Sequence, residues 1–173
     1  MSFLQRLFGE TKQRAALMPL YQALVGIGRD PAWYREGGVP DTLDGRFDIL
    51  AAVTALALLR LEAEGDAGKV PSVLLTELFI EDMDGTLRQI GIGDYVVGKH
   101  VGRMVGALGG RLGAFREGLQ AGSLAEAVDR NIFHEAPPSP ASVDFVARRL
   151  EGFSEKLTQV PVATLYDGKV PSP

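Results

Sequence analysis

The chain has 173 residues, of which 46% are hydrophobic and 23% are charged, and it contains no cysteine. This length and composition are typical of one compact globular domain and exclude a disordered or fibrous chain. The lack of cysteine excludes disulfides, a thiolate nucleophile and thiolate metal ligands, and the formal net charge of -4 argues against a general nucleic-acid binder.

Helical periodicity begins at residue 12. Residues 12–25 place apolar side chains three and four positions apart, which predicts a helix with one buried face. The following segment, RDPAWYREGGVPDTLDGRFD, is rich in proline and glycine and predicts an ordered loop. Its Trp33, Tyr34 and Val39 are apolar, so we expect them to anchor the loop to the body of the protein.

A second helix is expected from Thr42 or Asp44, either of which can act as its N-cap, to about Gly65. It contains the longest apolar run of the chain, residues 49–59, which is too short to span a membrane and suits a buried core helix. Residues 65–69 predict a flexible turn, and Ser72 is expected to cap a third helix that reaches residue 90.

Asp94 is expected to cap a fourth helix, which extends to about residue 119. Ser123 and Glu126 have capping-box spacing at the start of a short fifth helix that ends near residue 133. A proline-rich linker leads to a last helix over residues 142–157.

No alternating strand pattern and no internal repeat is present. The predicted fold is an all-α, single compact domain of about six helices, with the ordered loop between the first two long helices. We expect residues 1–11 to form a short N-terminal amphipathic segment, residues 12–159 the helical domain, and residues 160–173 an extended C-terminal tail.

The stretch GDYVVGKH matches the spacing of a phosphate-binding loop, but His100 stands where a Ser or Thr hydroxyl must bind magnesium. Glu81, Asp82 and Asp84 resemble oxygen ligands, yet on a helix Asp82 and Asp84 point about 200° apart. A pair between Asp84 and Arg88 at i, i+4 is the expected role instead. No nucleophile motif is present either. Together, these observations predict no metal, no cofactor, no catalytic residue and no enzyme.

Glycines recur every four residues along the fourth predicted helix, at Gly98, Gly102, Gly106 and Gly110. Each glycine inside a helix costs about 0.8–1 kcal/mol relative to alanine, so small size on this face should serve a contact. Close packing onto another helix of the same domain is the favoured interpretation. The alternative is a groove that accepts the helix of a partner through small-residue contacts.

Charge is segregated along the chain. Residues 88–116 contain five Arg or Lys residues and one acid, whereas residues 41–84 contain ten acids and three bases. Two solvated faces of opposite charge are the simpler interpretation. A basic surface for an acidic partner, ribosomal RNA or anionic lipid is the alternative.

Two separated motifs carry a family resemblance. The loop GVPDTLDGRFD, preceded by YQALVGIGRDPAWY, and the later stretch EDMDGTLRQIGIGDYVVGKHVGRM resemble the ubiquinol–cytochrome c chaperone family. The match extends from Tyr21 to Arg116, and more loosely to Leu150. His100 and Gly102 depart from the expected basic pattern, which argues against strong RNA binding.

The resemblance implies an all-helical, non-enzymatic assembly factor for the cytochrome bc1 complex (respiratory complex III) that binds newly synthesised cytochrome b. It implies a bacterial member that is cytoplasmic and peripheral to the inner membrane, allows a weak ribosome contact, and gives no reason to expect DNA binding. The expected partner-binding residues are Arg46, Asp84, Arg88, Asp94, Tyr95, Lys99 and Arg103. A helical lipid- or small-molecule-binding domain that uses the glycine-lined groove is the alternative.

Overall fold

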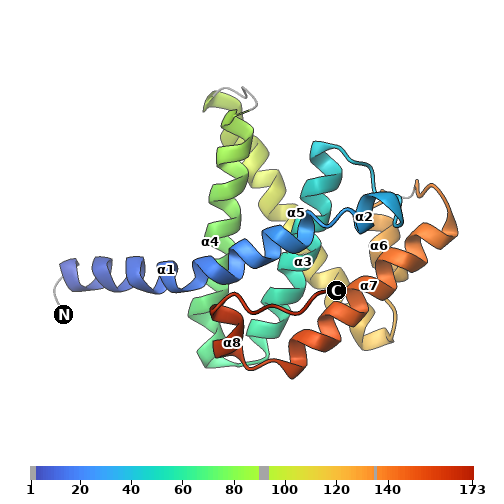
Figure 1. Cartoon of the computed structure of the whole chain (residues 1–173). Coiled ribbons are helices and arrows are strands. Elements are labelled where there is room, and N and C mark those ends of the chain that lie inside the picture. The colour runs from blue at the N-terminus through green and yellow to red at the C-terminus, as the bar shows by residue number, and fades with distance from the viewer. Residues whose placement is uncertain (1–2, 90–93, 135) are drawn as a thin grey trace.

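A computed structural model describes the backbone of residues 3–89, 94–134 and 136–173, and the side chains of residues 12–89, 98–134 and 136–173. These residues form eight helices and no strand, which confirms the all-α class (Figure 1). The helices are α1 (Phe3–Gly28), α2 (Ala32–Arg35), α3 (Leu43–Glu62), α4 (Asp66–Gln89), α5 (Asp94–Ala121), α6 (Ala125–Asn131), α7 (Pro140–Gln159) and α8 (Val162–Tyr166).

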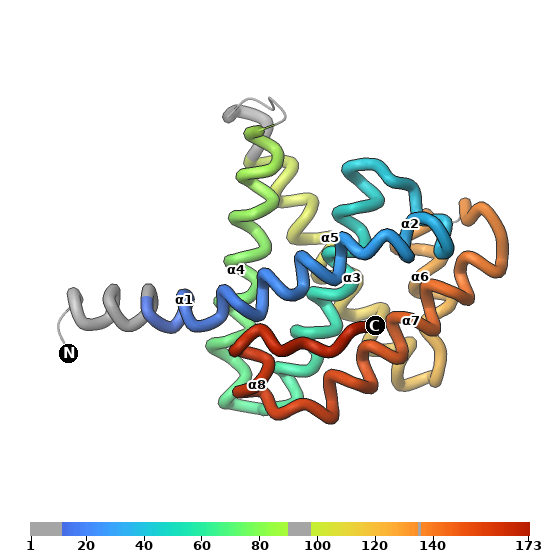
Figure 2. Tube along the Cα trace, in the orientation of Figure 1, coloured from blue at the N-terminus to red at the C-terminus, as the bar shows by residue number. Residues whose placement is uncertain are grey.

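Helix α3 forms the centre of the molecule. Every residue from Ile49 to Leu58 is buried, as the long apolar run predicts. α3 contacts α1, α4, α5 and α7, and α1 crosses both α3 and α4 (Figure 2). The Gly45 amide donates to the Thr42 hydroxyl oxygen at 3.2 Å, so Thr42 is the N-cap of α3. Each large apolar side chain buried here contributes about 1.5–3 kcal/mol of hydrophobic stabilisation.

The loop between α1 and α3 is anchored as predicted. Trp33 is fully buried and Val39 nearly so. The Trp33 indole N–H donates to the Ile27 carbonyl at 2.8 Å, and the Tyr34 hydroxyl donates to the Gly28 carbonyl at 2.7 Å. Both bonds satisfy carbonyls that the end of α1 leaves without an intrahelical partner. The sequence did not predict the short helix α2 within this loop.

The predicted flexible turn at residues 65–69 is wrong beyond Gly65, because α4 begins at Asp66 instead of Ser72. In the sequence, Gly68 and Pro71 suggest that no helix passes through them, yet both residues lie inside α4. Gly68 packs against the end of α3, where an added Cβ would lie 1.8 Å from the Leu61 carbonyl oxygen. This glycine therefore permits a close helix–helix approach and does not form a turn.

The predicted capping box of α6 is also wrong. The amide of Leu124 donates to the Glu151 carboxylate of α7 at 2.6 Å, and Glu126 pairs with Arg130 instead of the helix N-terminus. Ser123 accepts a bond from the Ala125 amide at 3.2 Å. A tertiary contact with α7 therefore replaces the local cap.

The chain after α7 is not wholly extended. The short helix α8 interrupts residues 160–173, and its Leu165 is buried. At the other end of the chain, the backbone of α1 is helical from Phe3, so the segment predicted over residues 1–11 is continuous with the following helix from that residue on. Its side chains, and hence its amphipathic character, lie outside the described residues.

Candidate functional site

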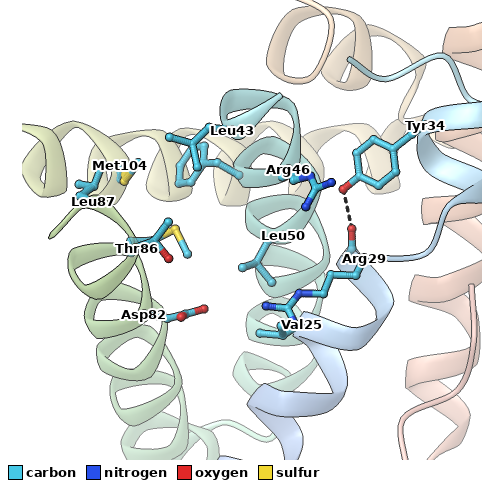
Figure 3. Close-up of a pocket in the computed structure, with 13 residues that line it drawn as sticks. Val25, Arg29, Tyr34, Leu43, Arg46, Leu50, Asp82, Thr86, Leu87 and Met104 are labelled. Atoms are coloured by element: carbon cyan, nitrogen blue, oxygen red, sulfur yellow. Dashed lines mark hydrogen bonds between the residues drawn. The ribbon is translucent and has the colours of Figure 1, made fainter. Parts of the chain in front are cut away.

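A cavity of about 210 Å³ lies where α1, α3 and α4 meet the loop that carries Tyr34. Figure 3 shows its α4 side chains on one side, with Arg29 and Arg46 across from them. The apolar part of its lining comes from several helices, and consists mainly of Val25, Leu43, Phe47, Leu50, Met83, Leu87 and Met104. The polar part consists of Arg29, Tyr34, Arg46, Asp82 and Thr86.

Local structure places the two arginines at this cavity. Arg29 directly follows the last residue of α1, and its amide still bonds the Val25 carbonyl at 3.2 Å. Arg46 lies in the first turn of α3, whose start is set by the Thr42 cap. Because one arginine comes from a helix end and the other from a helix start, their proximity depends on how α1 and α3 pack.

The charges at the cavity are only partly balanced. The Arg46 guanidinium donates to the Asp41 carboxylate at 2.7 Å, and this hydrogen bond lowers the pKa of Asp41. Asp82 accepts a bond from the Tyr21 hydroxyl at 2.7 Å, and burial together with this bond raises the pKa of Tyr21. The side chain of Arg29 makes no ion pair or hydrogen bond with a described residue, so its positive charge remains available.

A buried charge cluster lies on the other side of α3. Asp48 and Arg111 are 4% and 3% exposed, and the Arg111 guanidinium donates to one Asp48 oxygen while His134 Nε2 lies 2.9 Å from the other. Burial raises the pKa of Asp48, and the charge of Arg111 partly opposes that rise. Arg111 also bonds the carbonyls of Ala107 and Asn131, so the cluster ties α3 to α5 and to the end of α6.

Metal binding has no support in the part of the chain that the structure describes, where no group of three potential ligand side chains comes together. The pair predicted between Asp84 and Arg88 is confirmed, with Arg88 Nε 2.6 Å from an Asp84 carboxylate oxygen. This pair explains Asp84 without a metal ion.

The residues predicted to bind a partner fall into three groups. Arg46 lines the cavity, and the Asp84–Arg88 pair brackets Thr86 and Leu87, which also line it. Arg103 precedes Met104 of the cavity and contacts His100, while Lys99 is exposed one turn earlier in α5. The side chains of Asp94 and Tyr95 lie outside the described residues. A partner-binding role for all seven residues remains a prediction.

The favoured interpretation of the glycine stripe is wrong. Gly98, Gly102, Gly106 and Gly110 are exposed, and a Cβ at any of them would meet no described atom within 4 Å. The buried face of α5 instead carries Leu108, Arg111 and Phe115. Gly106 and Gly110 lie two positions from Leu108, which places them about 200° around the helix from the core.

The alternative of a glycine-lined ligand groove is not supported by the cavity. Among residues of α5 the lining of the cavity includes Met104 and no glycine of the stripe. Its volume of about 210 Å³ is also below the roughly 300 Å³ at which drug-sized ligand pockets begin.

The charge segregation seen along the sequence is largely undone by the fold. Arg111 pairs with Asp48, Arg116 with Glu62 at 2.6 Å, and Arg88 with Asp84. Three cations of the basic stretch therefore contact acids of the preceding acidic stretch. These contacts argue against a broad basic surface for RNA or lipid.

Sequence reasoning did not assign Arg29, Tyr34 or Met104 to a site. Arg29 and Tyr34 are part of the motif that carries the family resemblance, whereas Met104 belongs to an apolar stripe that periodicity assigns to packing. Only the packing of α1, α3, α4 and α5 shows that these residues line one cavity.

The fold and the site together define a helical protein with a cavity whose lining is partly apolar and partly charged. None of its described helices is long and apolar enough to cross a membrane. The family described as ubiquinol-cytochrome C chaperone matches residues 35–170, so the chain belongs to this family. This membership confirms the resemblance inferred from the two motifs.

The solved structures add a match over the whole fold. The crystal structure of the Cbp3 homolog from Brucella abortus has a TM-score of 0.80 with this chain at 27% identity, and the match covers 99% of this chain and 97% of that one. No curated protein sequence matches.

Proposed function

We propose that this protein is a non-enzymatic chaperone that binds newly synthesised cytochrome b during assembly of the cytochrome bc1 complex. The observation that carries the proposal is the family match over residues 35–170. The similarity to the Cbp3 homolog over nearly the full length of both chains supports it, because the whole fold is then shared and not a single motif.

The exposed glycine face of α5 suits a hydrophobic client. Gly102, Gly106 and Gly110 leave open space beside the helix backbone, and small residues of this kind allow two helices to approach closely. We propose that a transmembrane helix of cytochrome b packs here before insertion is complete. The charged residues Arg88, Lys99 and Arg103, from the neighbouring ends of α4 and α5, would contact its polar flanks.

A client that is inserted into the inner membrane places the chaperone at that membrane. We therefore propose a cytoplasmic protein with a peripheral membrane contact and at most a weak contact with the ribosome.

The first test is a tagged pull-down from membranes of the native host, analysed by mass spectrometry and by haem b absorbance. Cytochrome b should be enriched over the mature subunits of the bc1 complex, because a chaperone holds an early intermediate. Recovery of the mature complex in full, or of no cytochrome b, would contradict the proposal.

The second test reverses two charges. The double variant Arg88→Glu/Lys99→Glu should reduce the amount of assembled bc1 complex while its helical circular dichroism stays unchanged, because both side chains are at least partly exposed. Arg148→Glu, on the exposed face of α7, is the matched control. Normal assembly of the bc1 complex with the double variant would contradict a role of Arg88 and Lys99 in binding the client.

A further inference from the structure

Three hollows of the surface meet at Arg29. The first is the 210 Å³ cavity. A wider hollow of about 530 Å³ runs between α1 and α4 past Met18 and Gln22, and a third of about 280 Å³ is lined by Pro31, Arg35 and Asp41. Arg29 lines all three hollows. The 210 Å³ cavity also shares Val25 and Asp82 with the second hollow, and Tyr34 and Arg46 with the third, so the three adjoin as one cleft with this cavity at its middle.

Three arginines and three acids line the cleft as a whole, and its positive charge is concentrated in the third hollow. Arg29, Arg35 and Arg46 line its third hollow, where Asp41 is the acid and is held by Arg46. In the other two hollows Asp82 accepts the Tyr21 hydroxyl, and Glu81 pairs with Arg14. Neither Arg29 nor Arg35 has an ion pair with a described residue. The chemistry that complements them is a carboxylate group of a ligand.

The size of the cavity limits what can enter it. A cavity of about 150 Å³ lined by apolar side chains holds benzene, so the 210 Å³ found here holds one large apolar side chain. It does not hold the two acyl chains of a phospholipid. Met83 and Met104 contribute to the lining, and their flexible side chains adapt to differently shaped occupants.

A series of three adjoining hollows, with a largely apolar cavity at the middle and arginines along it, matches an extended polypeptide. We propose that the cleft binds an acidic segment of a partner protein, with one aromatic or branched aliphatic side chain in the cavity and adjacent carboxylates on Arg29 and Arg35. The identity of that partner rests on the proposed function, and the segment would be a part of cytochrome b that lies outside the membrane. Anchoring of a chain by one side chain in a pocket is the usual form of an interaction hot spot.

The probe is a fluorescein-labelled peptide, capped at both ends, with a central phenylalanine between two pairs of aspartates. Fluorescence anisotropy with the full chain should show saturable binding that weakens as salt is added. Replacement of the phenylalanine by alanine, or of the aspartates by asparagines, should weaken binding about tenfold, because each removes one of the two recognition elements.

Two protein variants locate the binding. Arg29→Glu reverses the charge shared by the three hollows, and Thr86→Phe fills the cavity from a partly exposed position on α4. Each should weaken binding about tenfold, whereas the matched charge control Arg148→Glu should not. Circular dichroism identifies a variant that has failed to fold. The other variant then tests whether the peptide binds in the cleft.

Lack of peptide binding, or binding that survives both variants, would overturn the proposal. Binding of inorganic phosphate or of anionic phosphatidylglycerol vesicles at Arg29 in place of the peptide would overturn it as well. The pull-down separates the proposed chaperone function from the proposed peptide site. Recovery of cytochrome b without peptide binding would contradict only the peptide site in the cleft. Peptide binding without recovery of cytochrome b would contradict only the proposed chaperone function.

Discussion

At the scale of single residues, the buried pair of Asp48 and Arg111 is a feature on which stability depends strongly. The two residues are 63 positions apart and nearly inaccessible to water. Removing one partner of a buried ion pair leaves the other charge desolvated and uncompensated, which costs more than the pair itself contributes.

Asp48→Ala should therefore lower the free energy of unfolding by about 3–5 kcal/mol, measured by urea denaturation. Asp144→Ala, at an exposed position on α7, should change it by less than about 0.5 kcal/mol. The double variant Asp48→Leu/Arg111→Met should recover much of the loss, because it leaves no buried charge. A loss below about 1 kcal/mol in Asp48→Ala would mean that water reaches Arg111.

Tyr21 links the cleft to the stability of the protein at alkaline pH. Its pKa is raised by burial and by the hydrogen bond to Asp82, so the folded state favours the protonated phenol. The stabilisation that comes from this raised pKa is fully present below the unfolded-state pKa of about 10. It is lost as the pH rises beyond that value.

Tyr21→Phe should therefore flatten the fall in unfolding free energy above about pH 10. At neutral pH it should cost about 0.5–1.5 kcal/mol, because the hydrogen bond to Asp82 is lost. Urea denaturation at several pH values measures both effects. Burial also raises the pKa of Tyr34 and Tyr166, so some slope remains. An unchanged alkaline slope would show that Tyr21 does not control it.

At the scale of helices, α5 is the element whose sequence is least explained by its own fold. A Cβ added at any of four glycines on its exposed face would meet no described atom within 4 Å. In an exposed helix interior, glycine is destabilising because it exposes the backbone to water and loses the most conformational entropy on folding.

Gly102→Ala, Gly106→Ala and Gly110→Ala should each raise the free energy of unfolding by about 0.5–1 kcal/mol. If the glycine face receives a partner helix, the same variants should reduce bc1 assembly although the protein is more stable. Gly152→Ala in α7 is the matched control, since a Cβ there also meets open space, and it should stabilise without affecting assembly. Full assembly in all three α5 variants would exclude a close helix contact on this face.

At the scale of the whole molecule, the C-terminal segment closes the fold against its first helix. Leu165 of α8 is 1% exposed, and α8 contacts α1. Gly168 follows with φ 77° and lies against Pro19 of α1, where a Cβ would come 3.0 Å from the Pro19 carbonyl oxygen.

Leu165→Ala should lower the free energy of unfolding by about 2–5 kcal/mol through lost burial and a residual cavity, measured by urea denaturation. Lys169→Ala, at an exposed position, is the control. A loss below about 1 kcal/mol would show that α8 packs without stabilising the domain.

The sequence by itself determined the helical class, the six longer helices and the buried character of α3, because these depend on periodicity and composition within one segment. Local signals failed where a tertiary contact took their place. Gly68 reads as a turn but meets the Leu61 carbonyl, and Ser123 and Glu126 read as a cap although Leu124 bonds α7.

Only the tertiary structure decided which charges meet and which residues share the cleft. Asp48 with Arg111, and Glu62 with Arg116, pair across distances of 63 and 54 residues, so no local pattern can reveal them. The cleft joins the end of α1, the start of α3 and the C-terminal part of α4. Side chains from several helices converge only after packing sets the relative rotation of each helix, and that rotation depends on every buried face of the helix.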